Sequence, residues 1–205
     1  MSTAPHPVAV HLVDDEAPVR DALEFLFTSH GFSVRSYASG TALLATLDGP
    51  VPVRGCILLD VRMEPLSGLQ VHDALVARGI PVPVIFLTGH GDIPMAVEAL
   101  KKGAFDFVEK PFGDAALVER VRDALAAEAA QQQRLAEGDA RGAKLAGLTQ
   151  REQELMHRVA AGKLNKVIAD EMHISVRTVE VYRARVYAKL GVRSAAELAT
   201  LLARS

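Results

Sequence analysis

Four apolar segments in the first 110 residues each end on polar residues that could take part in phosphoryl transfer. VAVHLVDD ends on Asp14 and Asp15, CILLD on Asp60, VIFLT on Thr88 and FDFVEK on Lys110. Carboxylates can bind a divalent cation or attack phosphorus, and a hydroxyl and an ammonium group can hold phosphoryl oxygens. These residue types therefore predict a site that binds a metal ion and accepts a phosphoryl group.

The segments that end on these residues are expected to be strands of one parallel sheet. Near-continuous apolar runs of about five or six residues, separated by segments with helical spacing, are typical of strands covered by helices on both faces. Ligands of such sheets bind outside the carboxyl ends of the strands. The polar residues should therefore meet at one edge of the sheet.

The complete pattern predicts five β-α units. Strands are expected at 8–13, 32–37, 56–60, 84–87 and 105–109. Helices are expected from Pro18 to Gly31, at 41–47, 69–78 and 93–102, and from Asp114 onward. Five such units in about 125 residues indicate a doubly wound α/β domain with a five-stranded parallel sheet.

The last helix of this domain should turn into a connector. Leu117, Val121 and Leu125 share one stripe, after which Ala, Gln and Glu dominate up to about residue 137. The segment GDARG at 138–142 is a plausible break or hinge. We therefore expect a first domain at 1–125, a helical linker at 126–147 and a second domain at 148–205.

The second domain is expected to be all-α. Its helices are predicted at 150–161, 165–172, 176–190 and 195–203. Thr149 and Glu152 fit the capping box that starts a helix. Only three residues, ending in Ser175 as an N-cap, separate the second and third helices. Two helices joined by such a turn indicate a helix-turn-helix.

Composition limits the class of protein. At 205 residues the chain can form two domains with separate cores. Residues 148–205 carry ten lysines and arginines and six acidic residues, a net charge of +4. Residues 1–147 carry 13 lysines and arginines and 19 acidic residues, a net charge of −6. A basic domain is compatible with nucleic acid binding. No apolar stretch approaches the roughly 20 residues that span a bilayer, and the single Cys56 fits a reducing cytoplasm. We expect a cytoplasmic protein that does not enter the membrane.

Both halves resemble known bacterial signalling domains. Residues 1–125 resemble a two-component receiver domain, a flavodoxin-like fold, because Asp14-Asp15, Asp60, Thr88 and Lys110-Pro111 match that family's acidic pocket, phosphoacceptor, hydroxyl switch and lysine. Residues 148–205 resemble the LuxR/NarL-type helix-turn-helix domain through the segments LTQRE, NKVIA, ISVRTVEVYRARV and KLGV. LDVRMEPLSGL, TGHGDIPMAVEALKKGAFDFVEKPF and RTVEVYRA resemble the FixJ subgroup.

The resemblance implies a response regulator that catalyses only its own phosphorylation and dephosphorylation. Asp60 would be the phosphorylated aspartate, and Lys110 would bind the transferred phosphoryl group. Asp15, Asp60 and the backbone carbonyl of Arg62 would bind Mg²⁺ or Mn²⁺, with Asp14 nearby. The bond between Lys110 and the following proline would be cis.

The resemblance also implies a switch at Thr88 and Phe107. Thr88 would turn to bind the phosphoryl oxygens and leave space that Phe107 fills by moving inward. From the sequence alone, a permanently buried strand aromatic is an equal alternative for Phe107. Similar receivers dimerise through the neighbouring helix and strand, which would here present Val97, Lys101 and Asp106.

Two features near the predicted pocket depart from the FixJ pattern. Receivers of this subgroup usually read DVRMPG after the phosphoacceptor, whereas Glu64-Pro65 stands here. The extra carboxylate could slow attack on an anionic donor, but a side chain in solvent is the favoured interpretation. Arg62 and His90 stand two residues after the phosphoacceptor and the hydroxyl, where receiver side chains tend to influence hydrolysis of the acyl phosphate.

Helical geometry divides residues 176–190 into two faces. Val179, Val186 and Leu190 should pack on the other helices. A solvated helix face is one interpretation of the opposite side, but its mixture of small, apolar and charged groups also suits a major groove. The expected DNA contacts on this helix are Arg177, Thr178, Glu180, Val181, Ala184 and Arg185. The expected phosphate contacts at the start of the preceding helix are Lys163, Asn165 and Lys166.

Three classes of function fit parts of this pattern. A phosphorylation-dependent transcription regulator accounts for both domains, with a sensor histidine kinase, double-stranded DNA, RNA polymerase and a second copy of the chain as partners. A phosphatase-like hydrolase would need a second acid two residues after the nucleophile, where Arg62 stands. A phosphorelay carrier would leave the helical domain unexplained. The first class is therefore the expected one.

Overall fold

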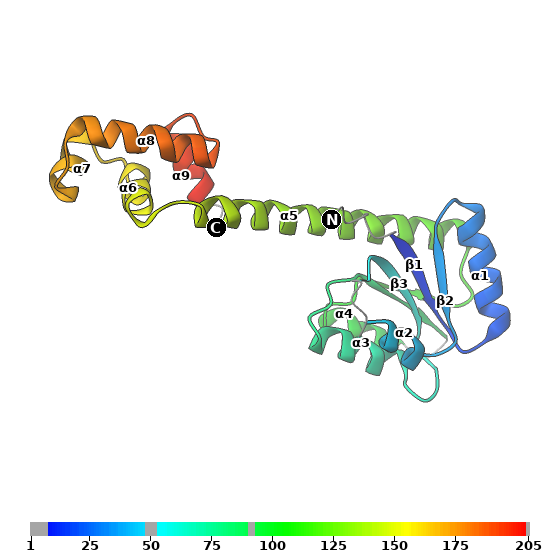
Figure 1. Ribbon diagram of the computed structural model, residues 1–205. Helices are drawn as coiled ribbons and strands as arrows, with labels where there is room; N and C mark the ends of the chain where they lie inside the picture. Colours follow the sequence, from blue (N-terminus) through cyan, green and yellow to red (C-terminus); the bar gives the residue numbers. More distant parts are fainter. Residues whose placement is uncertain (1–7, 48–52, 90–92, 204–205) are drawn as a thin grey trace. The chain divides into compact units, whose positions relative to one another are not determined.

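Residues 8–47, 53–89 and 93–203 are described by the computed structural model (Figure 1). The chain divides into two units, Met1–Gln131 and Gln132–Ser205. The division lies within the segment 126–147 that we expected to be a linker. Within the described ranges, no helix is long and apolar enough to cross a membrane.

The first unit is built on a five-stranded sheet in which all paired strands are parallel. Its strands are β1 (Ala9–Val13), β2 (Val34–Tyr37), β3 (Gly55–Asp60), β4 (Val84–Thr88) and β5 (Asp106–Glu109). They lie in the order β2-β1-β3-β4-β5. The crossovers between these parallel strands contain helices, as such connections usually do. The expected doubly wound α/β fold is confirmed.

Helices cover both faces of this sheet (Figure 1). They are α1 (Ala17–Ser29), α2 (Gly40–Leu47), α3 (Gly68–Ala77), α4 (Ile93–Lys101) and the first part of α5 (Asp114–Ala146). Phe27 of α1 and Leu117 of α5 are buried in one core. Leu43 of α2 and Val71 of α3 are buried in the other. The sheet therefore has a hydrophobic core on each side.

The central strand β3 shows why apolar and polar residues do not alternate along these segments. Its side chains point alternately to the two faces, so that Ile57 and Leu59 join one core while Cys56 and Leu58 join the other. All six residues of β3 are buried. A strand of this kind must be apolar on both faces, and Cys56 is a buried thiol, as expected.

The helix α5 corrects one prediction. Residues 114–146 form one continuous helix, so the break expected at GDARG, residues 138–142, is wrong. Each glycine costs roughly 0.5–1 kcal/mol relative to alanine in a helix, but the neighbouring Ala, Glu and Arg residues favour helix and no proline interrupts it. Two isolated glycines without proline are therefore insufficient to end the helix.

The second unit contains the four expected short helices. They are α6 (Gln150–Ala160), α7 (Asn165–Met172), α8 (Val176–Leu190) and α9 (Ala195–Ala203). The predicted capping box is present, because the Thr149 hydroxyl and the Glu152 carboxylate each accept a backbone N–H from the other residue. Glu152 is buried and also accepts a hydrogen bond from Nζ of Lys189 at 2.7 Å.

The turn between α7 and α8 has the predicted form. It contains three residues, and its first residue, His173, has a left-handed backbone with φ of 52°. The hydroxyl of Ser175 accepts a hydrogen bond from the backbone N–H of Thr178 at 3.1 Å, which confirms it as the N-cap of α8. The helix-turn-helix is confirmed.

Candidate functional site

The predicted reactive residues stand at the carboxyl ends of four neighbouring strands. Asp14 follows β1, Asp60 ends β3, Thr88 ends β4 and Lys110 follows β5. Because β1, β3, β4 and β5 are parallel and adjacent, these residues lie along one edge of the sheet. This edge is where ligands bind in open α/β sheets.

The ammonium group of Lys110 joins two of the acids directly. Its Nζ atom lies 2.7 Å from Oδ1 of Asp60 and 3.1 Å from Oδ2 of Asp14. Both carboxylates are buried, so their charges are poorly screened by solvent. Lys110 is the cation that lets the two acids lie side by side.

Backbone N–H groups hold the other carboxylate oxygens. The N–H of Arg62 donates to Oδ2 of Asp60 at 2.7 Å, and the N–H of Glu16 donates to Oδ1 of Asp14 at 2.9 Å. These contacts fix the orientation of each carboxylate. One oxygen of Asp60 faces the ammonium group of Lys110 while the other is held by the following loop.

Burial and charge act in opposite directions on this ion pair. Burial raises the pKa of Asp60 above its ordinary value, although the hydrogen bond and charge of Lys110 partly offset that effect. Burial lowers the pKa of Lys110, but its contacts with Asp60 and Asp14 outweigh burial and raise that pKa overall. Lys110 therefore stays protonated, and a carboxylate with little solvation stands next to it.

Thr88 has a hydroxyl group without a partner. It is fully buried, and its Oγ1 forms no hydrogen bond within the described part of the chain. Leaving a buried hydroxyl unpaired costs roughly 1–3 kcal/mol. A group with oxygen acceptors that arrived at Asp60 would relieve this cost, because Asp60 pairs with Leu87, the residue just before Thr88, in the register of β3 and β4.

Phe107 lies on β5 opposite Phe86 of β4. Its side chain is only partly buried, and it packs against the core beneath α3 and α4. The ring is thus less buried than the alternative of a permanently buried strand aromatic implies, and its movement stays a prediction.

The oxygen donors at this edge suit a hard divalent cation. Asp15 is exposed next to the buried Asp14, and Arg62 is exposed next to Asp60. Within the described residues, no three His, Cys, Asp or Glu side chains lie close enough to hold a metal ion by themselves. The expected set of two carboxylates and one backbone carbonyl does not require such a triad, so the residues present fit Mg²⁺.

The two departures from the FixJ pattern have separate outcomes. Glu64 is exposed, which confirms the interpretation that its side chain is in solvent. His90 lies outside the described residues. The Lys110-Pro111 and Glu64-Pro65 peptide bonds are both cis, and the first was expected.

The predicted groove face of α8 is open to solvent. Val179, Val186 and Leu190 are buried in the core of the second unit, as expected. Thr178 is partly exposed, and its hydroxyl is 2.8 Å from that of Ser175. The other expected contacts on this helix are all exposed: Arg177, Glu180, Val181, Ala184 and Arg185.

The start of α7 provides further donors beside this face. Leu164 is the N-cap and supplies no side-chain hydrogen bond, so the first backbone N–H groups of α7 have no side-chain cap. Lys166 is exposed. Asn165 accepts a hydrogen bond from Arg183, and Lys163 pairs with Glu171. An uncapped helix start beside lysines is suited to phosphate.

Comparison with known protein families decides between the classes of function. Residues 10–122 match the response regulator receiver domain, and residues 146–202 match the bacterial regulatory proteins of the luxR family. The chain is a two-component response regulator of the FixJ subgroup. Its output domain makes it a regulator of transcription, which accounts for both halves.

Full-length relatives share this domain arrangement. The C4-dicarboxylate transport transcriptional regulatory protein DctR of Rhodobacter capsulatus is 52% identical over 197 residues, covering 94% of this chain and 98% of the relative. Full-length FixJ from B. japonicum is 40% identical with a TM-score of 0.61, covering 96% of both chains. The response regulator StyR is 36% identical with a TM-score of 0.87, covering 97% of this chain and 100% of StyR.

Gly68 is a receiver residue near the site that the sequence interpretation missed. It opens α3, and a Cβ atom at this position would lie 2.2 Å from the backbone oxygen of Asp60. The start of α3 therefore packs directly on the backbone of Asp60. The signal was present in the sequence, because Ser67 and Gln70 form a capping box that marks this helix start.

The expected dimer face of the receiver is partly exposed. Val97 and Lys101 on α4 are exposed. Asp106 on β5 is partly buried and forms an ion pair with Arg120 of α5. The face thus combines an apolar side chain with charges of both signs.

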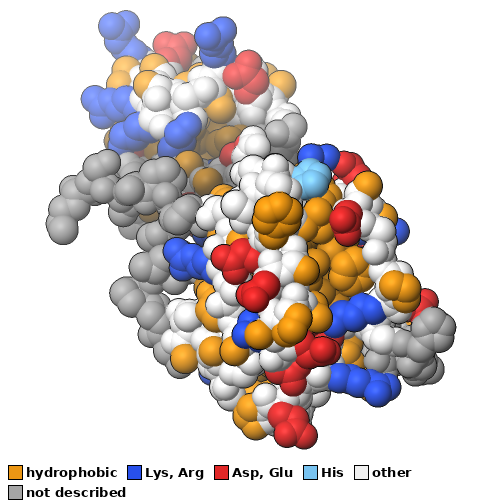
Figure 2. Space-filling view, turned by 90° about the vertical axis from the view of Figure 1, so that its right-hand side faces the viewer, with side chains coloured by type: hydrophobic (Ala, Val, Ile, Leu, Met, Phe, Trp, Pro, Cys, Tyr) orange, Lys and Arg blue, Asp and Glu red, His pale blue; other side chains and the backbone are white. Residues whose placement is uncertain are grey.

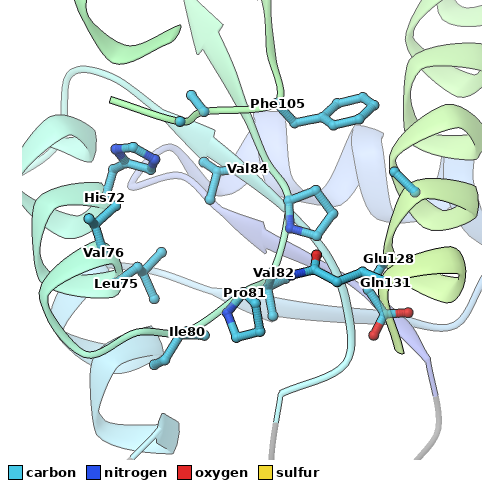
Figure 3. A pocket seen from close by; sticks show the side chains of 14 residues that line it. His72, Leu75, Val76, Ile80, Pro81, Val82, Val84, Phe105, Glu128 and Gln131 are labelled. Carbon is cyan, nitrogen blue, oxygen red and sulfur yellow. The ribbon is translucent and has the colours of Figure 1, made fainter. Parts of the chain in front are cut away.

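Two concave regions lie on the receiver outside the cluster of Asp14, Asp60 and Lys110. A groove of about 600 Å³ runs along α1 and includes Phe25 and Phe112, and hydrophobic side chains gather in a hollow on the side that Figure 2 faces. A cavity of about 420 Å³ includes residues at the amino ends of β4 and β5, with His72 on one side and Glu128 and Gln131 on the other (Figure 3). It lies at the opposite edge of the sheet from Asp60.

Proposed function

We propose that Asp60 accepts the phosphoryl group and that its phosphorylation controls DNA binding by the output domain. The observation that supports this most directly is the 2.7 Å contact between Lys110 and Asp60. It positions a cation where the negative charge of a phosphoryl group would be added. The hydroxyl of Thr88, which has no partner among the described residues, provides a hydrogen bond donor for the same group.

The proposed reaction is an in-line displacement. A carboxylate oxygen of Asp60 attacks phosphorus, the bond from phosphorus to the donor atom breaks, and the bonding electrons leave with the donor. Lys110 balances charge on the phosphoryl oxygens. Mg²⁺ or Mn²⁺, when bound by Asp15, Asp60 and the carbonyl of Arg62 near Asp14, supplies further charge neutralisation.

The proposed switch follows from the same edge of the sheet. The hydroxyl of Thr88, unpaired within the part of the chain that the structure describes, donates to a phosphoryl oxygen on Asp60. Phe107, which is partly buried at rest, moves inward towards the core. This movement changes the surface of α4 and β5, which we propose as the dimer face with Val97, Lys101 and Asp106.

A sensor histidine kinase is the proposed donor of the phosphoryl group. The apolar groove along α1 adjoins the reactive edge, because α1 follows Asp14 and Asp15 directly and Phe112 follows Lys110 by two residues. A protein donor must approach this edge to reach Asp60. We therefore propose the groove around the exposed Phe25 as its docking surface.

The proposed DNA contacts divide into two groups. The exposed face of α8 enters the major groove with Arg177, Thr178, Glu180, Val181, Ala184 and Arg185. Lys163, Asn165 and Lys166 contact phosphates, and Lys163 must then share its charge between phosphate and Glu171. A homodimer would read two half-sites. RNA polymerase is a further proposed partner, and the cytoplasm is the proposed location.

The proposal is tested by measuring assembly and DNA capture together. Beryllofluoride, a phosphoryl analogue, should shift the wild-type protein from monomer to dimer in sedimentation and increase recovery of specific genomic fragments. The Asp60→Asn variant should show neither change. Equal mass and equal capture with and without beryllofluoride in the wild-type protein would refute the proposed control.

A further inference from the structure

Arg183 lies on α8 between the buried stripe and the exposed face. Its NH1 group donates to Oδ1 of Asn165 at 2.5 Å, and its NH2 group donates to the hydroxyl of Tyr187 at 2.8 Å. The guanidinium carbon also lies 5.5 Å from the centre of the Tyr187 ring. Three contacts therefore fix one side chain that the sequence interpretation left without a role.

The contact with Asn165 determines which way its carboxamide faces. A guanidinium group has donors only, so the atom of Asn165 that it binds must be the oxygen. The amide NH₂ group of Asn165 therefore points away from Arg183. Asn165 is the first residue of α7, where the N-cap Leu164 provides no side-chain acceptor or donor. The NH₂ group thus belongs to the first residue of a helix whose N-terminal backbone N–H groups have no side-chain cap.

We propose that Arg183 is a positioning residue for DNA binding, which holds the carboxamide of Asn165 so that its NH₂ group donates to a DNA phosphate. The inference rests on the proposed DNA contacts at the start of α7. In this arrangement Arg183 does not grip DNA itself, because two of its nitrogens are already bound within the domain. Tyr187 accepts a hydrogen bond from the same guanidinium group and so also holds it within the domain.

Arg185 provides the matched comparison. It lies two residues further along α8 and is exposed, whereas Arg183 is partly buried. Substitution of either arginine by glutamine removes one positive charge from the same helix. Only the substitution at position 183 also releases the carboxamide of Asn165. A difference between the two variants therefore reports on positioning rather than on net charge.

The test is a double-mutant cycle of DNA affinity in the full-length protein with a mixed-sequence duplex of roughly 20 bp, about two helical turns. Arg183→Gln and Asn165→Ala should each weaken binding by roughly threefold to tenfold, the range of one hydrogen bond. The double variant should bind no more weakly than either single one. Arg185→Gln combined with Asn165→Ala should instead show additive losses.

Two readouts separate positioning from other roles. Arg183→Gln should lower the slope of log K against log salt by less than the roughly 0.9 that a direct phosphate contact contributes. Tyr187→Phe, which removes only the hydroxyl acceptor, should give a smaller loss of affinity that disappears in the Asn165→Ala background. If Arg183→Gln does not fold, this second cycle decides the question.

The contradicting results are distinct from failure of the proposed function. Additive losses for Arg183→Gln and Asn165→Ala, or unchanged affinity in Asn165→Ala, would overturn the positioning role while DNA binding stands. A wild-type protein that does not bind the duplex at low salt even in the presence of beryllofluoride would overturn both. The positioning role would also be contradicted if Tyr187→Phe still weakened DNA binding in the Asn165→Ala background.

Discussion

Lys110 and Asp60, 50 positions apart in the sequence, form an ion pair with 2.7 Å between Nζ and Oδ1. The pair brings the end of β3 and the end of β5 together, although β4 lies between these strands. The long side chain of Lys110 bridges that gap. The site therefore depends on a long flexible cation at the edge strand.

Removing this cation should impair phosphorylation. Lys110→Gln leaves Asp60 and Asp14 close together without their shared counterion, and a charge-assisted hydrogen bond contributes roughly 1.5–3 kcal/mol. Acyl phosphate formation from acetyl phosphate should slow at least about tenfold. Lys102→Gln is the control, because Lys102 pairs with Asp73 on the surface. Equal rates for the two variants would contradict the role of Lys110.

Thr88→Val should separate stability from switching. Valine has nearly the shape of threonine but lacks the buried hydroxyl, for which the described ranges contain no partner. The resting protein should be as stable as the wild type or more stable by up to about 1–3 kcal/mol in urea unfolding. Dimerisation with beryllofluoride should be lost. Thr88→Ser should retain it, and a switch that survives in the valine variant would exclude Thr88.

Gly68→Ala should disturb the phosphoacceptor through its backbone. The new Cβ would lie 2.2 Å from the backbone oxygen of Asp60, so the loop must move at a cost of roughly 1–3 kcal/mol. Both thermal stability and the rate of phosphorylation should fall. Gly113→Ala is the control, since nothing lies within 4 Å of a Cβ at that position. The prediction fails if the two variants behave alike.

Glu152 should make the output domain sensitive to acid. Its hydrogen bond from Lys189 lowers the pKa of this carboxyl below its ordinary value of 4.5, and the backbone N–H of Thr149 adds to the shift. A carboxyl group whose pKa is lowered by folding stabilises the folded protein at pH values above its ordinary pKa. That stabilisation is lost as the pH falls through the folded-state pKa. Glu152→Gln should therefore be less stable than the wild type near neutral pH, with the difference shrinking below the ordinary pKa. Urea unfolding across this range measures it, and a constant difference would count against the ion pair.

The proposed groove and phosphate contacts should differ in their effects on DNA binding. If Arg177 and Arg185 bind base edges, the Arg177→Ala and Arg185→Ala variants should each lose roughly 1–3 kcal/mol of DNA-binding free energy and show a weaker sequence preference. Lys166→Ala should weaken binding to all sequences about equally and reduce the salt slope by about 0.9. Titrations at several salt concentrations separate the two patterns. Unchanged affinity and preference in both arginine variants would show that the face is wrongly assigned.

The sequence predicted most of the fold because the three inner strands, β1, β3 and β4, are buried on both faces. The apolar composition of β3 and β4 follows from that burial, and it makes the ends of these strands visible in the sequence. Parallel strands then bring their carboxyl ends together. Asp60, Thr88 and Lys110 could therefore be placed at one edge without knowledge of the contacts between them.

Contacts that depend on how helices pack could not be predicted. Arg183 and Asn165 are 18 positions apart, and their contact depends on the packing of α7 against α8. The buried Glu128 of α5 pairs with Arg54, 74 positions away, next to β3. The continuous α5 was missed for a different reason. The cost of Gly138 and Gly142 is small compared with the helix preference of their neighbours.

The central claim is that Asp60 is the phosphoacceptor, and the intact mass of the protein tests it most directly. After incubation with acetyl phosphate and Mg²⁺, the wild-type protein should gain one phosphoryl group, and Asp60→Asn should gain none, because an amide cannot act as this nucleophile. The same phosphoryl gain in Asp60→Asn, or none in the wild-type protein, would contradict the account.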